Sequence, residues 1–191
     1  GSVTGANTGD TANDDAAEVH VDGLTGTDPT PQLTLAAGTI EDPTGLAIST
    51  AQTITTTDGA PPAMTDATTH DPDNDGTTEW VNVTFSEAID DATSDLTAGT
   101  FSLDEGTVDA VTTGRTTDDD ALNLSVSEVS QTPDVTVGAN AIFDAAGNAL
   151  AASQTFEASD TTAPGIVAAR THDLDRDGTV DNIDVTLTEP D

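Results

Sequence analysis

An internal repeat limits what this chain can fold into more than any other feature of its sequence. When the chain is shifted by 102 residues, residues 33–89 align with residues 135–191 without a gap, and 21 of the 57 aligned pairs are identical. The sequence Thr-His-Asp-x-Asp-x-Asp-Gly-Thr at 69–77 returns at 171–179. Self-similarity at a fixed period indicates copies of one folded unit. We therefore expect tandem domains of about 102 residues.

The repeat divides the chain into three parts. Toward the amino terminus the shift becomes 105, so that Val19 aligns with Leu124. Residues 1–58 then correspond to the carboxy-terminal part of one repeat and residues 62–163 to a complete repeat. Residues 164–191 correspond to the first two strands of a further repeat. Proline-containing linkers, which favour extended chain, separate the three parts.

Apolar residues of the repeat recur at every second position, which is the period of a strand. Val81, Val83 and Phe85 alternate with polar residues, and so do Leu122 and Leu124. Threonine, which favours strands, fills many of the outward positions. Seven short strands are predicted in the complete repeat, near 64–69, 79–87, 100–103, 107–112, 121–127, 134–138 and 153–158. Seven strands in about a hundred residues predict an all-β fold, a β-sandwich repeated in tandem.

The chain is acidic along its whole length. It carries 36 Asp and Glu residues against 3 Arg and no Lys, and its net charge is -33. At low ionic strength this charge repels itself and destabilises a compact state, whereas salt at about 1 M shortens the Debye length to about 3 Å. The composition resembles proteins of extreme halophiles. An acidic disordered tail is the alternative, but tails carry their acids in blocks.

The composition also excludes several classes of function. Nucleic-acid binding is not expected, because the chain cannot neutralise phosphates. No apolar run approaches the roughly 20 residues of a membrane helix, so membrane insertion is not expected either. The absence of Cys excludes thiol catalysis and disulfides. With 3 His, no Tyr and no Lys, no catalytic constellation stands out, and we do not expect an enzyme.

Two acidic loops share the spacing of a calcium-binding loop. Each has carboxylates at positions 1, 3, 5 and 9 and glycine at position 6, so alternate carboxylates turn toward one cation around a tight turn. Position 7 would offer a backbone carbonyl, and position 12 is Asn or Asp instead of Glu. The predicted ligands are Asp71, Asp73, Asp75, Thr77, Glu79 and Asn82 in the first loop, and Asp173, Asp175, Asp177, Thr179, Asp181 and Asp184 in the second. Hard oxygen ligands favour calcium; magnesium, sodium, potassium or a solvated acidic turn are the alternatives.

Other polar and aromatic residues give further indications. His70 and His172 directly precede the acidic loops, and we expect them to have packing roles at strand ends. Two Asn-x-Ser/Thr sequences make Asn82 and Asn123 candidate glycosylation sites on the outward phase of their strands; ordinary surface asparagines are the alternative. Trp80 has no aromatic counterpart in the next repeat, and it is expected to cover the acidic loop or a domain junction, or to stack on a sugar.

Four segments of the repeat carry a resemblance to a known family. They are residues 83–88, 143–150, 160–164 and 172–178. With these segments the chain resembles, over essentially its whole length, the bacterial Ig-like domains of S-layer and other large surface proteins. The resemblance implies Ig-like β-sandwiches, an extracellular location at the cell surface and a structural role in an S-layer or filament. An adhesin or carbohydrate-binding surface module is the alternative function.

The two ends of the chain are predicted to be complementary parts of one sandwich. Residues 164–191 would supply its first two strands and residues 1–58 its last four, and each part alone leaves an apolar sheet face and unpaired edges. Either the chain is a slice of a longer tandem array, or one copy's tail completes the next copy by strand addition. Such a contact does not close and would build a homopolymeric filament. Expected partners are therefore neighbouring repeats or further copies, together with glycans.

Overall fold

The computed structural model describes residues 1–8, 11–12, 15–130 and 132–188. Strands make up 43% of the chain, and the fold is all-β. Across these described ranges, no helix is long and apolar enough to span a membrane. The last three residues of the predicted third segment lie outside the described residues.

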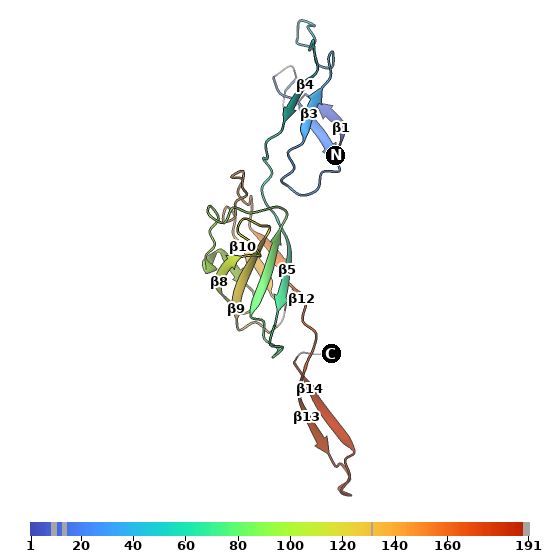
Figure 1. Cartoon of the computed structure of the whole chain (residues 1–191), viewed down its shortest axis with the longest axis vertical. Coiled ribbons are helices and arrows are strands. Elements are labelled where there is room, and N and C mark those ends of the chain that lie inside the picture. The colour runs from blue at the N-terminus through green and yellow to red at the C-terminus, as the bar shows by residue number, and fades with distance from the viewer. Residues whose placement is uncertain (9–10, 13–14, 131, 189–191) are drawn as a thin grey trace. The chain divides into compact units, whose positions relative to one another are not determined.

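The chain divides into two compact units, Gly1–Ala60 and Pro61–Asp191 (Figure 1). The division falls within the proline-containing linker that the sequence predicts around residues 57–62. Residues 164–191 belong to the second unit, together with the residues of the complete repeat.

Two sheets of the second unit form a β-sandwich. One sheet has the strand order β12-β5-β6-β9-β8 and the other β11-β10-β7. A single turn of 3-10 helix, η1 (Ala98–Thr100), precedes β7. The strands are β5 (Met64–His70), β6 (Trp80–Phe85), β7 (Phe101–Leu103), β8 (Thr107–Thr113), β9 (Ala121–Ser127), β10 (Asp134–Val137), β11 (Gln154–Glu157) and β12 (Ser159–Asp160). All seven predicted strands are present, and only the short β12, which pairs in parallel with β5, was not predicted.

The core of the sandwich is filled by the inward residues of both sheets. Val81 and Leu124 from the larger sheet and Val135 from the smaller one are fully buried, as is Ile142 from the loop after β10. Val81 and Leu124 are among the apolar residues whose alternation predicted the strands, and burying each contributes roughly 1.5–3 kcal/mol. All of the buried apolar residues described in the structure lie between positions 62 and 158.

The first unit consists of two separate hairpins. Strands β1 (Ser2–Asn7) and β2 (Glu18–Asp22) form one, and β3 (Gln32–Leu35) and β4 (Gln52–Thr55) form the other. Every described residue of positions 1–60 is at least partly exposed. The first unit therefore has strands but no buried core among its described residues.

The strand pairs of the first unit have the same register as pairs of the sandwich. A bulge follows Val3 in the β1–β2 pair, and a bulge follows Val108 at the corresponding point of β8–β9. In β3–β4 the hydroxyls of Thr34 and Thr53 are 2.8 Å apart across the strands. The hydroxyls of Thr136 and Thr155 are 2.7 Å apart in β10–β11. These are the pairs that the sequence shifts of 105 and 102 bring into alignment.

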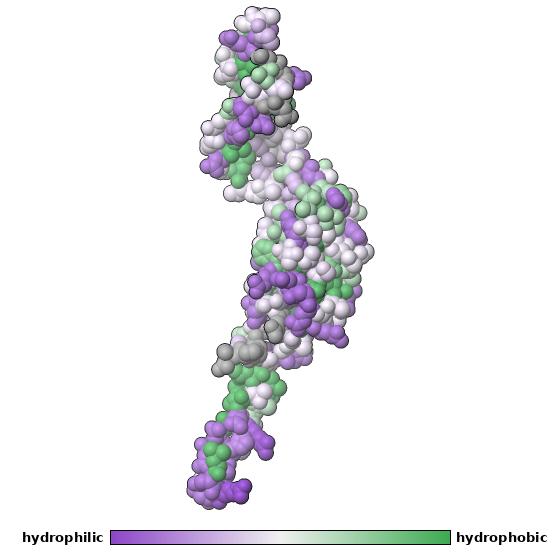
Figure 2. All heavy atoms as spheres, turned by 180° about the vertical axis from the view of Figure 1, so that it is seen from behind, coloured by the Kyte–Doolittle hydropathy of each residue, from purple (hydrophilic) through white to green (hydrophobic). Residues whose placement is uncertain are grey.

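A third hairpin, β13 (Ile166–His172) and β14 (Asn182–Leu187), ends the described chain. Its register repeats that of β5–β6, including the bulge after the first residue of the leading strand. At its base, the Thr188 hydroxyl lies 3.4 Å from Asn74 Oδ1 in the first acidic loop. Figure 2 shows hydrophobic residues at the surface of this hairpin, beside the hydrophilic residues of the loop at its tip.

Candidate metal sites

The first acidic loop joins β5 to β6, and its own backbone holds it in a tight turn. Asp71 accepts hydrogen bonds from the backbone N–H groups of Asp75 at 3.2 Å and Gly76 at 2.8 Å. Asn74 and Gly76 have φ values of 56° and 92°. The glycine at position 6 is needed there, because L side chains rarely adopt such a φ. A Cβ on Gly76 would also collide with the carbonyl oxygen of Thr188.

Four carboxylates of this loop converge on one point. Asp71, Asp73, Asp75 and Glu79 each place one oxygen within 4.8 Å of the others. Partial desolvation and the neighbouring Asp75 raise the pKa of Asp73. Burial raises the pKa of Glu79, and the charges of Asp73 and Asp71 add to it. Hydrogen bonds from Thr77 instead lower the pKa of Asp75. The crowding therefore disfavours negative charge at Asp73 and Glu79.

Glu79 carries an oxygen that the rest of the loop does not satisfy. Its Oε1 accepts a hydrogen bond of 3.3 Å from the Thr77 hydroxyl. Its Oε2 is buried and has no hydrogen-bond partner among the described residues. A buried acceptor without a partner costs about 1–3 kcal/mol. A cation among the four carboxylates would remove both this cost and the repulsion, so the residues present fit a hard cation.

The second acidic loop joins β13 to β14 and copies the backbone of the first. Arg176 and Gly178 have φ values of 64° and 91°, and the Gly178 N–H donates to Asp173 at 2.9 Å. Three exposed carboxylates have oxygens within 4.8 Å of one another; they belong to Asp173, Asp175 and Asp177. Hydrogen bonds from Thr179 lower the pKa of Asp177. The second loop therefore has the same shape with fewer converging charges.

The two loops differ in what the carboxylate at position 9 contacts. Asp181 accepts hydrogen bonds from the backbone N–H groups of Leu174 at 2.7 Å and Asp175 at 3.3 Å. Its Oδ2 thus closes the loop, whereas Glu79 turns into the carboxylate cluster of the first loop. Glu is one methylene longer than Asp and reaches the cluster. We infer that the first loop is the stronger candidate for a cation.

The side chains at positions 7 and 12 make hydrogen bonds or contacts of their own, and the backbone carbonyl at position 7 stays a predicted ligand. Thr77 donates its hydroxyl to Asp75, and Thr179 does the same to Asp177. Asn82 lies in β6 and donates its amide to Asn123 Oδ1 at 2.9 Å. Asp184 lies in β14, with its Oδ2 2.7 Å from His172 Nε2. Position 12 thus belongs to a strand in both loops, and Asp184 is not among the clustered carboxylates of the second loop.

Both histidines that precede the loops are the last residues of strands. His70 is the last residue of β5. The centre of its ring lies 6.0 Å from the centre of the Trp80 ring, and the two ring planes are inclined by 35°. His172 ends β13 and pairs with Asp184. Both contacts are made across a strand pair. His70 faces Trp80 in the β5–β6 register, and His172 in β13 reaches Asp184 in β14.

The two candidate glycosylation residues face each other on the outer side of the larger sheet. Asn82 in β6 is the direct cross-strand neighbour of Asn123 in β9. The Asn82 side-chain nitrogen donates to Asn123, and the Asn123 nitrogen donates to the Thr113 carbonyl at 3.4 Å. Each nitrogen uses one of its two N–H groups in these bonds, and a glycan would replace a hydrogen on that nitrogen. Modification of either residue stays a prediction.

A buried pair of carboxylates was not predicted from the sequence. Glu87 and Asp144 lie in the sandwich with only 5% and 1% of their surfaces exposed, and one oxygen of each lies within 4.8 Å of the other. Burial acts to raise the pKa of Asp144, but hydrogen bonds from Asn148, Ala146 and Gly147 lower it overall. Both acids recur in the repeat, since Asp144 aligns with Asp42 and Glu87 with Glu189, and this recurrence is the sequence signal for the pair.

No protein-family model, curated protein or solved structure matches this chain. The residues described above therefore carry the functional argument by themselves.

Proposed function

We propose that this chain is a structural module of a halophile's cell-surface protein, an S-layer or filament component built from tandem Ig-like repeats and stabilised by calcium. The observation that carries the proposal is the recurrence of one strand pair, with one bulge and one acidic loop, at two places 102 residues apart. Repetition of a whole β-unit suits a chain that extends by adding copies of itself.

Calcium would be held mainly by Asp71, Asp73, Asp75 and Glu79. These carboxylates supply the oxygen ligands that Ca²⁺ prefers, and the unpartnered Glu79 Oε2 gives the ion a buried acceptor. Bound calcium would supply positive charge that neutralises the loop. An ion that binds only the folded state stabilises it by about 2.7 kcal/mol at 100 times its dissociation constant.

The charge of the chain supports a halophilic, extracellular setting. A net charge of -33 on 191 residues leaves the compact state self-repelling at low salt. Screening at about 1 M salt reduces the Debye length to about 3 Å, so charges on different parts of the surface no longer repel one another strongly. The absence of Cys removes any need for a defined redox environment.

Thermal unfolding of the full chain in molar KCl, with calcium or with a chelator at matched ionic strength, tests this function. We expect calcium to raise the melting temperature, and magnesium at the same concentration to raise it less, because Mg²⁺ demands stricter octahedral geometry. An unchanged melt in the presence of chelator would overturn the calcium part of the proposal.

A second candidate function is carbohydrate binding, which the exposed Trp80 favours. The indole is 40% exposed and borders a shallow hollow of about 350 Å³ with Thr112, Asn123 and Ser125. An aromatic face ringed by neutral hydrogen-bonding groups suits the apolar face and hydroxyls of a sugar. Quenching of the single tryptophan's fluorescence by neutral oligosaccharides, and its absence with negatively charged ones, would support this candidate.

A further inference from the structure

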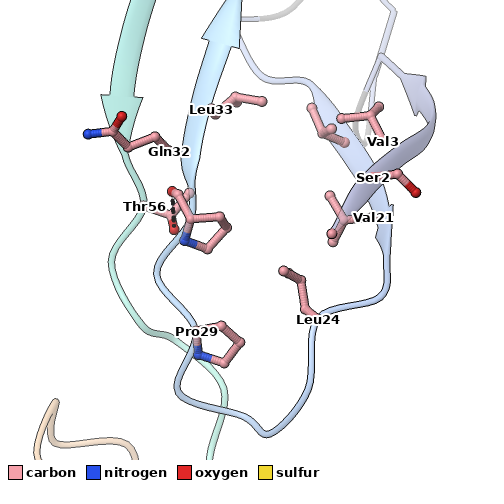
Figure 3. Close-up of a pocket in the computed structure, with 11 residues that line it drawn as sticks. Ser2, Val3, Val21, Leu24, Pro29, Gln32, Leu33 and Thr56 are labelled. Atoms are coloured by element: carbon pink, nitrogen blue, oxygen red, sulfur yellow. Dashed lines mark hydrogen bonds between the residues drawn. The ribbon is translucent and has the colours of Figure 1, made fainter.

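An apolar groove runs between the two hairpins of the first unit. It has a volume of about 320 Å³, and Figure 3 shows Val3, Val21 and Leu24 on one side facing Pro29 and Leu33 on the other. A second hollow of about 470 Å³ includes Ala17, Ile40 and Ile48 in its lining. The apolar residues of this unit thus face one another across open space.

The corresponding residues of the sandwich are buried. Val21 is 48% exposed, whereas Val126, at the aligned position, is 6% exposed. Leu24 is 37% exposed, whereas its counterpart Val129 is fully buried. The strand registers on either side are the same, so the difference comes from the neighbouring elements. In the sandwich, β6 of the β5–β6 hairpin pairs with β9, whereas β2 belongs to a two-stranded sheet with β1.

The β13–β14 hairpin exposes apolar residues whose counterparts in the sandwich are buried. Ile183 is 57% exposed and Val185 is 51% exposed, although their counterparts Val81 and Val83 are fully buried in the sandwich. Ile166, at the position of the buried Met64, is exposed as well. An apolar strand face with an unpaired edge is unfavourable in water and favours pairing with another strand.

We propose that the β13–β14 hairpin of one copy docks on the first unit of a second copy, with β14 adding to β2 as β6 adds to β9. This docking rests on the repeat arrangement of the proposed function. The binding partner is a second copy of the same chain. In the register of β6 and β9, Ile183 lies opposite Val19 and Val185 opposite Ala17. The apolar face of the hairpin then covers the groove.

Basic side chains lie beside the one like-charge pair that this register creates on the outer face. Docking would place Glu18 opposite Asp184, and two carboxylates in that position repel each other. Arg170 is the cross-strand neighbour of Asp184, and His172 lies 2.7 Å from it. His20 would lie beside both carboxylates. The register therefore rests on the apolar residues, and the basic side chains reduce its electrostatic cost.

The contact joins different surfaces of the two copies, so it does not close on itself. A docked pair of copies still offers one free hairpin and one free groove. Such a head-to-tail contact builds a chain of subunits, held by main-chain hydrogen bonds and apolar burial.

Two complementary variants test the contact in the full chain, in molar KCl with calcium. Val185→Asp disables the hairpin and Val21→Asp disables the groove, and both residues are exposed in the single copy. By light scattering after size exclusion, we expect the natural chain to form multimers and each variant alone to stay at 19.2 kDa. An equimolar mixture should form a dimer and stop, because only one intact hairpin and one intact groove remain. Leu174→Asp, which adds the same charge at the exposed tip of the hairpin, should leave assembly unchanged.

The register is tested by disulfide trapping, which is clean because the chain has no Cys. A copy with Glu18→Cys mixed with a copy carrying Asp184→Cys should give a covalent dimer on oxidation. Glu18→Cys mixed with Thr186→Cys, two residues out of register on the same face, should cross-link at least tenfold less.

Three results would overturn the proposal: a monomeric natural chain at high concentration, failure of the two variants to combine, or a Glu18→Cys/Asp184→Cys double variant that cross-links within one chain. The monomeric Val185→Asp variant also separates this proposal from the proposed function. If its melt rises with calcium but the two variants do not combine, only the assembly is wrong. If calcium has no effect while the variants combine, only the calcium role is wrong.

Discussion

Replacing Glu79 by Gln should change stability in opposite directions with and without calcium. Without calcium, the substitution removes a negative charge that lies within 4.8 Å of three others. At that distance and in water, each like-charge pair costs about 0.9 kcal/mol before screening. Molar salt screens most of this repulsion. We therefore expect E79Q to stabilise the calcium-free protein by less than about 1 kcal/mol.

With calcium, E79Q should destabilise the protein, because it removes a charged ligand from the cluster. At a calcium concentration of 100 times the dissociation constant, the natural chain gains about 2.7 kcal/mol. For a domain of about a hundred residues, 1 kcal/mol shifts the melting temperature by about 4–8 °C. The variant should therefore melt slightly higher than the natural chain in chelator, and about 10 °C or more lower in calcium.

The assay is calorimetric unfolding in 2 M KCl, with calcium or chelator at the same ionic strength. Asp181→Asn is the matched control, because it removes one charge at the same position of the second loop, where the carboxylate bonds to the loop backbone. That control should lower stability slightly in both conditions and leave the calcium gain nearly unchanged. A lower melting temperature for E79Q in chelator would refute the reasoning, because repulsion would then not act on Glu79.

Three more predictions follow from the fold, the charge and the buried acid. Leu124→Ala should destabilise the sandwich by about 2–5 kcal/mol, whereas Leu24→Ala in the monomeric Val185→Asp background should change the melt by less than about 0.5 kcal/mol. Dilution from molar salt to about 0.1 M without divalent cations should weaken the far-UV β signal, since the Debye length grows to about 10 Å; full retention would argue against the halophilic setting. The lowered pKa of Asp144 gives stability that is present above the ordinary Asp range and lost as pH falls through the lowered pKa, so the deficit of Asp144→Asn in urea unfolding should shrink below about pH 4.

The strands could be predicted because a strand leaves a strong local signal. Val81, Val83 and Leu124 alternate with polar residues, and all three are buried in the sandwich. The repeat shift also brings into alignment the strand pairs that share bulges, such as those after Val3 and Val108. The two-residue strand β12 left no such signal, because it is defined by its parallel pairing with β5.

The candidate site could be predicted only in part, because its first nine positions are local and the rest is not. The spacing brought Asp71, Asp73 and Asp75 together around a glycine turn. Position 12 was carried over from a loop that is followed by a helix, whereas a strand follows here and Asn82 faces Asn123 instead. Burial of Glu79 Oε2 depends on tertiary packing, as does the approach of Glu87 to Asp144. The spacing of residues along the chain predicts neither the burial of Glu79 Oε2 nor the approach of Glu87 to Asp144.

The most direct test of the account is a crystal structure of the full chain grown in molar KCl with calcium. We predict one strong density peak in the first loop, with oxygens of Asp71, Asp73, Asp75 and Glu79 about 2.3–2.6 Å from it. The second loop should show a weaker peak or only water. An ordered first loop with no ion at that point, and with Glu79 turned out to solvent, would contradict the account.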